Sequence, residues 1–245
     1  MLFIPPCACS LREVKLCLTK TLPDLPSAKL SEALAASAGF NTNAALRSSL
    51  WTPGVDPAEL RALSFDDVRF ARRLGDFKLD LPTGWQGFDT FGRSIWVGNR
   101  YQSKKGLAGR NVMVAAILSG LTQRIFTLDP DGSFWPDAKV QKGTLFHVWM
   151  PHDIPAQAWV SDIGMGELSI HVACWPTGRF LSSGNAGFEA GDAVVKGWLE
   201  RETGKWLMND GRGGLTINIR RNRVEQLSSL VTPTVGFADQ GRFIM

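Results

Sequence analysis

Side chains that could perform metal or acid–base chemistry are concentrated in one stretch of the chain. All three histidines lie there with a thiol and two carboxylates: His147, His152, His171, Asp153, Glu167 and Cys174. Imidazoles beside a carboxylate or thiolate bind zinc or transfer protons. The spacing argues against a metal site, because His171 and Cys174 are three residues apart on an expected strand and so point to opposite faces. Neither HExxH nor a paired CxxC occurs, so we expect structural histidines, no metal and no cofactor.

A metal-independent RNA-processing endonuclease is the enzyme that these residues fit best. In such an enzyme a histidine transfers the proton and arginines stabilise the charge at phosphorus. The sequence does not indicate which histidine would do this. The nucleophile elbow, the P-loop and the dinucleotide fingerprint are absent, and the glycine-rich 211–214 precedes an expected strand, whereas a phosphate cradle precedes a helix. The endonuclease stays open as an alternative.

A helix–turn–helix pattern covers residues 29–50. Ala35 is small enough for two helices to cross closely, and Gly39 suits the turn between them. The second helix would offer polar residues to DNA, since Asn and Arg have the donor geometry for base edges and phosphates. The predicted contacts are Asn41, Thr42, Asn43 and Arg47. Two helices joined by a glycine turn are also a common packing unit, so a purely structural role stays open.

Two runs of the chain contain basic but no acidic residues. In the first, 90–128, we expect a pliable, glycine-containing loop at 93–110 whose side chains contact phosphates and stack on bases: Arg93, Arg100, Tyr101, Lys104, Lys105 and Arg110. In the second, 211–224, the candidates are Arg212, Arg220, Arg221 and Arg223. The alternative is that these cations pair with carboxylates from elsewhere in the fold.

Composition indicates the setting in which this chemistry would operate. The chain has 245 residues, is 44% hydrophobic and carries a net charge of +4, a mild bias toward anionic partners. No window approaches the roughly 18 apolar residues of a membrane span, and the first ten residues lack the basic start of an export signal. The cysteines at 7, 9, 17 and 174 suggest neither a disulfide framework nor a zinc knuckle. We expect a cytoplasmic protein with no membrane partner.

The elements that must position these residues change character near residue 81. Before it the sequence predicts only helices, over 11–21 with a capping box at Ser10–Glu13, 27–38, 42–50 and from 64–67 to 75. After it the sequence predicts strands over 94–97, 145–150, 158–160, 168–175 and 215–221, and helices over 112–126, 193–207 and 224–230. We expect an α+β fold with a helical module at 1–80 and a mixed sheet-and-helix domain at 81–245.

The helix–turn–helix stretch, together with Leu22-Pro23-Asp24-Leu25 and Phe65–Leu74, resembles an N-terminal helical module of uncharacterised proteins carried on proteobacterial plasmids and integrative conjugative elements. The likeness covers mainly residues 10–80, with a weaker echo at Gly197–Trp206. It implies a mobile-element setting, in which DNA and RNA are frequent partners, and it supplies no catalytic residue.

Three functions follow as hypotheses. The first is a non-catalytic nucleic-acid-binding accessory protein that uses the helix–turn–helix unit and the two basic runs on DNA or RNA. The second is the metal-independent endonuclease. The third is a protein-interaction subunit of a complex, because tryptophan is enriched at binding hot spots and the chain has nine. Whether Trp135, Trp149, Trp159 and Trp175 are buried or form a surface patch would help to separate them.

Overall fold

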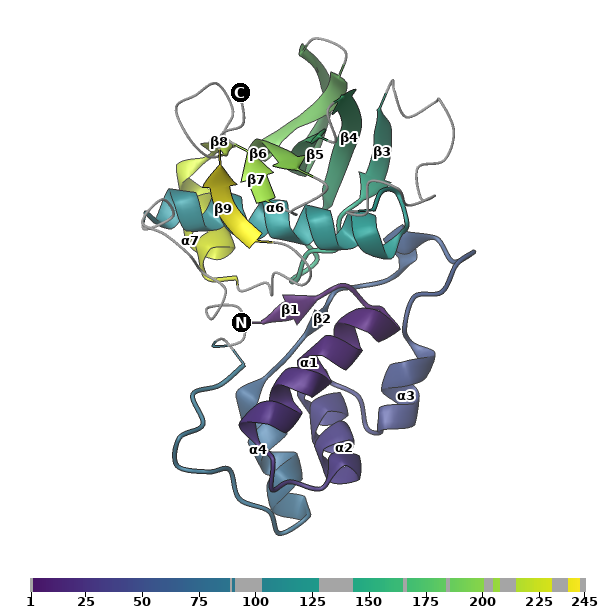
Figure 1. The fold of residues 1–245 in the computed structure, drawn as a ribbon, viewed down its shortest axis with the longest axis vertical. Coiled ribbons are helices and arrows are strands. Elements are labelled where there is room, and N and C mark those ends of the chain that lie inside the picture. Colours follow the sequence, from purple (N-terminus) through teal and green to yellow (C-terminus); the bar gives the residue numbers. More distant parts are fainter. Residues whose placement is uncertain are drawn as a thin grey trace.

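Two hydrophobic clusters organise the computed structural model of this protein, and the α+β fold is confirmed (Figure 1). The structure describes residues 2–88, 90, 103–127, 143–164, 167–183, 186–200, 205–207, 215–230 and 238–242. We call residues 2–88 the helical part and the described residues from 103 onward the sheet part. The first cluster lies inside the helical part, and the second lies around one long helix and a sheet.

The helical part is not all helix, contrary to the prediction. It contains α1 (Ala8–Thr21), α2 (Ser27–Ser37), α3 (Asn43–Ser48), a 3-10 turn η1 (Pro57–Glu59) and α4 (Asp67–Asp76). Two short strands, β1 (Phe3–Ile4) and β2 (Leu63–Ser64), pair antiparallel beside them. In α4, Phe70 and Leu74 are buried, whereas Val68 is 68% exposed.

The first helix begins earlier than its predicted capping box. Cys7 is the N-cap, and its Sγ accepts the N–H of Ser10 at 3.4 Å, so Ser10 lies inside the first turn. Pro5 and Pro6 precede this cap, and proline favours extended backbone in the residue before it, so the helix starts as soon as the prolines end. At α4, Asp66 is the N-cap and accepts the N–H groups of Val68 and Arg69 at 2.8 and 3.0 Å.

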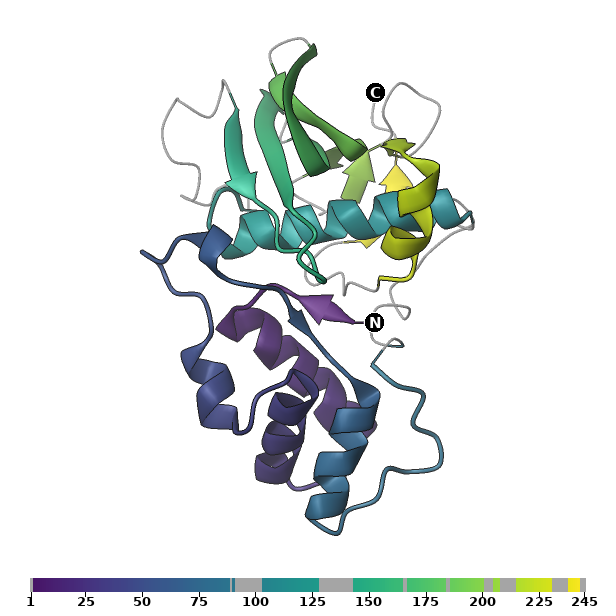
Figure 2. The ribbon, with the colours of Figure 1, turned by 180° about the vertical axis from the view of Figure 1, so that it is seen from behind.

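The sheet part consists of two helices and a sheet. Its helices are α6 (Lys104–Thr122) and α7 (Arg221–Ser228), and its strands are β3 (Thr144–His147), β4 (Ala156–Gly164), β5 (Glu167–Ser183), β6 (Ala186–Glu200), β7 (Lys205–Leu207), β8 (Thr216–Ile219) and β9 (Ala238–Arg242). The described strands run in the order β3-β4-β5-β6-β7-β9, with β8 beside β6, and all neighbours except β7 and β9 are antiparallel. Both views place α6 between the sheet and the helical part (Figures 1 and 2).

Two predictions in this part are wrong. Within the helix predicted at 193–207, the described residues 193–200 and 205–207 belong to strands β6 and β7. Ala193, Val195 and Leu199 are buried with the period of two that marks a strand. The long helix begins at Lys104, capped by Ser103, and not at residue 112, so the predicted loop at 93–110 is helical from Lys104 onward. The strand predicted at 94–97 lies outside the described residues.

Direct contacts join the two parts at a seam below α6. Trp149 is buried there, donates its indole N–H to Pro57 O at 2.9 Å and packs edge-on against Trp51 at 6.0 Å between ring centroids. Arg61 and Asp153 form an ion pair of 3.1 Å across the same seam. None of the helices described has both the length and the apolar character needed to cross a membrane.

Candidate nucleic-acid interface

Two helices joined by a turn, α2 and α3, occupy the stretch predicted as a helix–turn–helix unit, and the second of them is short. Gly39 has a positive φ of +90°, the conformation that favours glycine at a helix end. Thr42 caps α3 by accepting the N–H of Ala45 at 3.1 Å, and Glu32 of α2 accepts the N–H of Asn43 at 3.1 Å. The six residues of α3 make less than two helical turns, so this helix offers few side chains to a groove.

A first hollow lies between α1, α2 and α3 and has a volume of about 590 Å³. Leu11, Leu34 and Leu50 contribute apolar lining, and polar lining comes from Arg12, Lys15, Asn43 and Arg47. No ion pair to these cations occurs within the described chain. Two of the predicted contacts, Asn43 and Arg47, therefore line a basic hollow with two α1 cations that the sequence interpretation did not include.

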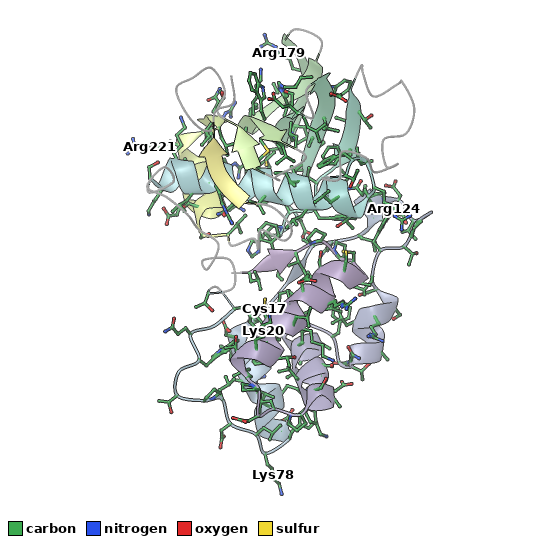
Figure 3. All side chains as sticks on the ribbon, viewed as in Figure 1. Cys17, Lys20, Lys78, Arg124, Arg179 and Arg221 are labelled. Atoms are coloured by element: carbon green, nitrogen blue, oxygen red, sulfur yellow. The ribbon has the colours of Figure 1, made fainter. Side chains whose placement is uncertain are left out.

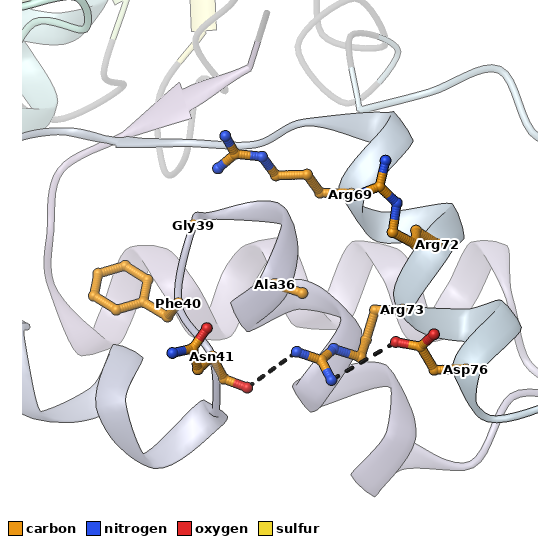
Figure 4. A pocket seen from close by; sticks show the side chains of 8 residues that line it. All are labelled: Ala36, Gly39, Phe40, Asn41, Arg69, Arg72, Arg73 and Asp76. Carbon is orange, nitrogen blue, oxygen red and sulfur yellow. Dashed lines mark hydrogen bonds and ion pairs between the residues drawn. The ribbon is translucent and has the colours of Figure 1, made fainter.

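A second hollow, of about 270 Å³, lies on the α4 side of the same turn (Figure 4). Its lining includes three arginines of α4, Arg69, Arg72 and Arg73, and the predicted contact Asn41. Arg73 is held in place, because it donates to Asn41 O at 3.2 Å and lies 3.8 Å from the Asp76 carboxylate. The second hollow thus has a fixed cation at its side and two more beside it.

Arg69 and Arg72 have no carboxylate partner among the residues that the structure describes. Both are exposed, and Figure 4 shows their guanidinium groups on the same side of α4. Gly39 leaves room for one of them, since a Cβ at that position would lie 3.2 Å from Arg69 Nη1. The turn at 39–43 is therefore flanked by cations from α1, α3 and α4.

The first predicted basic run is only partly available on the surface. Arg93, Arg100 and Tyr101 lie outside the described residues. Lys104 pairs with Glu225 at 2.5 Å, whereas Lys105 is exposed. Arg110 is 2% exposed and donates to Asn111 Oδ1 at 3.2 Å, so it is a core residue and does not reach the surface.

The second basic run meets a carboxylate from another element. Arg212 lies outside the described residues. Asp192 on β6 pairs with Arg220 at 3.0 Å and with Arg223 at 3.1 Å, and the guanidinium of Arg223 also lies 4.0 Å from the centre of the Trp175 ring. Arg221 is exposed without an ion pair in the described chain, at the α7 edge of the sheet part (Figure 3).

The histidines do not converge on a basic cleft. His171 is buried on β5 and lies 3.1 Å from Ser169 Oγ, and burial, with a contribution from Lys196, lowers its pKa to about 4. His147 lines two hollows at the seam, of about 400 and 520 Å³, and burial lowers its pKa although Asp56 acts in the opposite direction.

The larger of the two seam hollows has more carboxylates than cations in its lining. It is lined by one cation, Arg61, and by Glu59 and Asp153, and Arg61 is paired with Asp153. A phosphate entering there would meet carboxylates beside the histidine. No group of three or more metal-ligating side chains occurs in the described residues.

The described tryptophans named as candidate anchors are spread over different sites. Trp149 is buried at the seam, Trp175 lies under Arg223, and Trp159 is half-buried on β4, where its indole ring lies against Gly143. Trp135 lies outside the described residues. These rings therefore do not provide one aromatic patch for a partner protein.

Comparisons with known proteins found no family model, no curated protein and no solved structure that matches this chain.

Proposed function

We propose that this protein binds nucleic acid, without catalysis, through the 39–43 turn and the cations on its two sides. The observation that carries the proposal is the pair Arg69 and Arg72, exposed beside the turn with no carboxylate partner in the described chain. A guanidinium group binds phosphate oxygens with two parallel hydrogen bonds, and a phosphodiester backbone presents phosphates in series. Several cations around one turn suit that ligand better than a single small anion.

Phosphate contacts carry most of the affinity in this proposal. Cations from three helices take part: Arg12, Lys15, Arg47, Arg69 and Arg72. The six-residue α3 leaves few positions for base contacts, and the exposed Asn41 amide on the turn before it adds one. We therefore expect strong salt dependence and weak sequence preference.

The setting that we propose is a mobile genetic element. The resemblance to plasmid and conjugative-element proteins covers mainly residues 10–80, the same part of the chain that carries both hollows. An accessory protein that coats or docks on the element's DNA or RNA would need phosphate contacts of this kind and no catalytic residue.

The experiment is fluorescence anisotropy with double-stranded DNA, single-stranded DNA and structured RNA over a salt series. Wild-type binding should weaken with salt at a logarithmic slope of several, since each phosphate contact adds roughly 0.7 to 0.9. The double variant Arg69→Ala/Arg72→Ala should bind about tenfold more weakly and lose about two units of slope.

The matched control is Lys105→Ala/Arg221→Ala, which removes two exposed cations without a described ion-pair partner from the sheet part. It should bind like the wild type. Equal loss in both double variants would move the interface away from the turn. Absence of binding to all three ligands at low salt would overturn the proposal and favour the protein-interaction role.

A further inference from the structure

Two cysteines meet at the start of α1. Cys7 Sγ and Cys9 Sγ lie 2.7 Å apart, closer than a van der Waals contact between sulfur atoms and longer than the ~2.05 Å disulfide bond. Cys7 is the N-cap with extended backbone, φ −130° and ψ 158°, so its side chain turns back over the first helical turn where Cys9 lies. The two thiols are already in position to form a bond.

The two thiols differ in exposure. Cys7 is 4% exposed and its Sγ contacts Ser10 Oγ at 3.1 Å and Thr122 Oγ1 of α6 at 3.6 Å. Cys9 is exposed. A reagent from solution therefore reaches Cys9 first, and the buried Cys7 would act as the resolving thiol.

The surroundings of Cys7 favour its thiolate form. The hydrogen bond from Cys9, opposed by burial and helped by hydrogen bonds from Ser10, lowers the pKa of Cys7 to about 6. The same hydrogen bond is the main reason that the pKa of Cys9 is raised. The pair thus shares one proton at neutral pH, and moving that proton across the contact turns the exposed sulfur into the nucleophile.

We infer that Cys7 and Cys9 form a redox-active dithiol, a site that a small-molecule disulfide oxidises to an intramolecular Cys7–Cys9 bond. This inference is independent of the proposed function. The other two cysteines lack a thiol neighbour in the structure: Cys17 is exposed farther along α1 (Figure 3), and Cys174 is buried on β5.

The reaction has two exchange steps. The Cys9 thiolate attacks one sulfur of the reagent RSSR, forming a mixed disulfide and releasing RS⁻. Cys7 then loses its proton to water and attacks Cys9 Sγ, so that the Sγ–Sγ bond forms and the second RS⁻ leaves. Two protein sulfur atoms are oxidised, and the reagent is reduced to two RS⁻ groups. One of these takes up the proton that the pair had shared, and the other takes up a proton from solvent.

Oxidation would change the structure at the seam. Cys7 Sγ would be drawn into the bond and away from its contacts with Ser10 and Thr122. Because α1 begins at Ala8, and Ala8 and Arg12 line the first hollow, the same reaction would alter the start of the helix that carries two of its cations.

The test is a redox titration of the full chain in buffers of increasing oxidised-to-reduced glutathione ratio, quenched with acid and labelled with N-ethylmaleimide. Trypsin cleaves after Arg12, so one peptide holds Cys7 and Cys9 and no other cysteine. We expect this peptide to lose both labels and two hydrogen atoms, reversibly with dithiothreitol, while Cys17 and Cys174 stay labelled.

Two variants separate this site from general thiol oxidation. Cys17→Ser should form the bond at the same glutathione ratio as the wild type, and Cys9→Ser, a change at an exposed position, should keep Cys7 reduced. Persistent labelling of both cysteines at oxidising ratios would overturn the inference. So would a stable glutathione adduct on Cys9 or a disulfide between two chains. The readout is the mass of one peptide, so a negative result would not bear on the proposed nucleic-acid binding.

Discussion

Ionisable side chains have different surroundings in the helical part and in the sheet part. Beside the 39–43 turn, Arg69 and Arg72 have no carboxylate partner in the described chain. At the α6–α7 end, Arg220 and Arg223 share Asp192, and Lys104 pairs with Glu225. Stretches of sequence that are equally basic can thus differ in the net charge that they present to a ligand, because the fold supplies the counter-charge in one and not in the other.

The cysteines show the same contrast. At the helical part's first turn, the hydrogen bond from Cys9 lowers the pKa of Cys7 to about 6. In the core of the sheet part, burial alone raises the pKa of Cys174 to about 12. A buried thiol becomes reactive when donors converge on it and inert when they do not.

Of the variants at the α6–α7 end, where cations pair with carboxylates, Asp192→Asn should have the largest effect on stability. The Asp192 side chain is 15% exposed and holds two guanidinium groups, so removing its charge leaves both without their counter-ion. We expect the free energy of unfolding to fall by about 2 kcal/mol, measured by urea denaturation.

The same variant also tests whether the absence of a carboxylate partner is what separates the arginines beside the turn from those at the α6–α7 end. If unpaired arginines suffice for phosphate binding, Asp192→Asn should also bind nucleic acid several-fold more tightly than the wild type at low salt. Adding Arg220→Ala and Arg223→Ala to this variant should remove the gain. A stable Asp192→Asn protein with unchanged affinity would show that the geometry around the turn matters more than the absence of carboxylates.

Sequence patterns predicted the turn better than the charge pairing. Gly39 acts locally, through a positive φ, and the turn that it forms was predicted from neighbouring residues. Thr42 was predicted as a nucleic-acid contact, and in the structure it is the N-cap of α3. Asp192 meets Arg220 only because β6 and β8 are neighbouring strands, and β6 was mistaken for a helix. Partners brought together by the sheet are not visible in a local pattern.

Burial limited the site prediction in the same way. Arg110 stood in a basic run, but α6 is covered along its length by the sheet, α7 and the seam, so this guanidinium lies in the core. Arg69 and Arg72 were missed because the acidic Asp66 and Asp67 precede them in sequence. The available signal was their helical spacing, which places them on one side of α4.

An intermediate effect is expected from Cys9→Ala on the titration of thiolates. Thiolate absorbance of the wild type should report one ionisation with a midpoint near pH 6, since the pKa of Cys9, Cys17 and Cys174 is raised. Removing Cys9 deletes the largest cause of the lowered pKa, so the midpoint should move upward. Cys17→Ser is the control and should leave it in place.

The lowered pKa of Cys7 also determines how the stability of the protein changes with pH. The pKa of Cys7 is lower in the folded chain than the ordinary 9.0, so folding favours the thiolate. Its contribution to the free energy of unfolding grows as pH rises from about 6 to about 9 and is lost on acidification through pH 6. Cys9→Ala should flatten this pH dependence. An identical pH profile in both proteins would show that the thiol pair is not coupled as described.

The smallest effect on stability should come from Glu225→Gln. This variant tests how much the burial of a carboxylate matters for the ion pairs at the α6–α7 end. Its ion pair with Lys104 is short, at 2.5 Å, but the two side chains are 67% and 73% exposed. Water screens such a pair, and ordering two long side chains costs entropy, so the free energy of unfolding should fall by less than about 0.5 kcal/mol. The same urea denaturation used for Asp192→Asn measures it. A loss as large as that of Asp192→Asn would mean that pairing at the α6–α7 end is cooperative and that exposure does not rank these carboxylates.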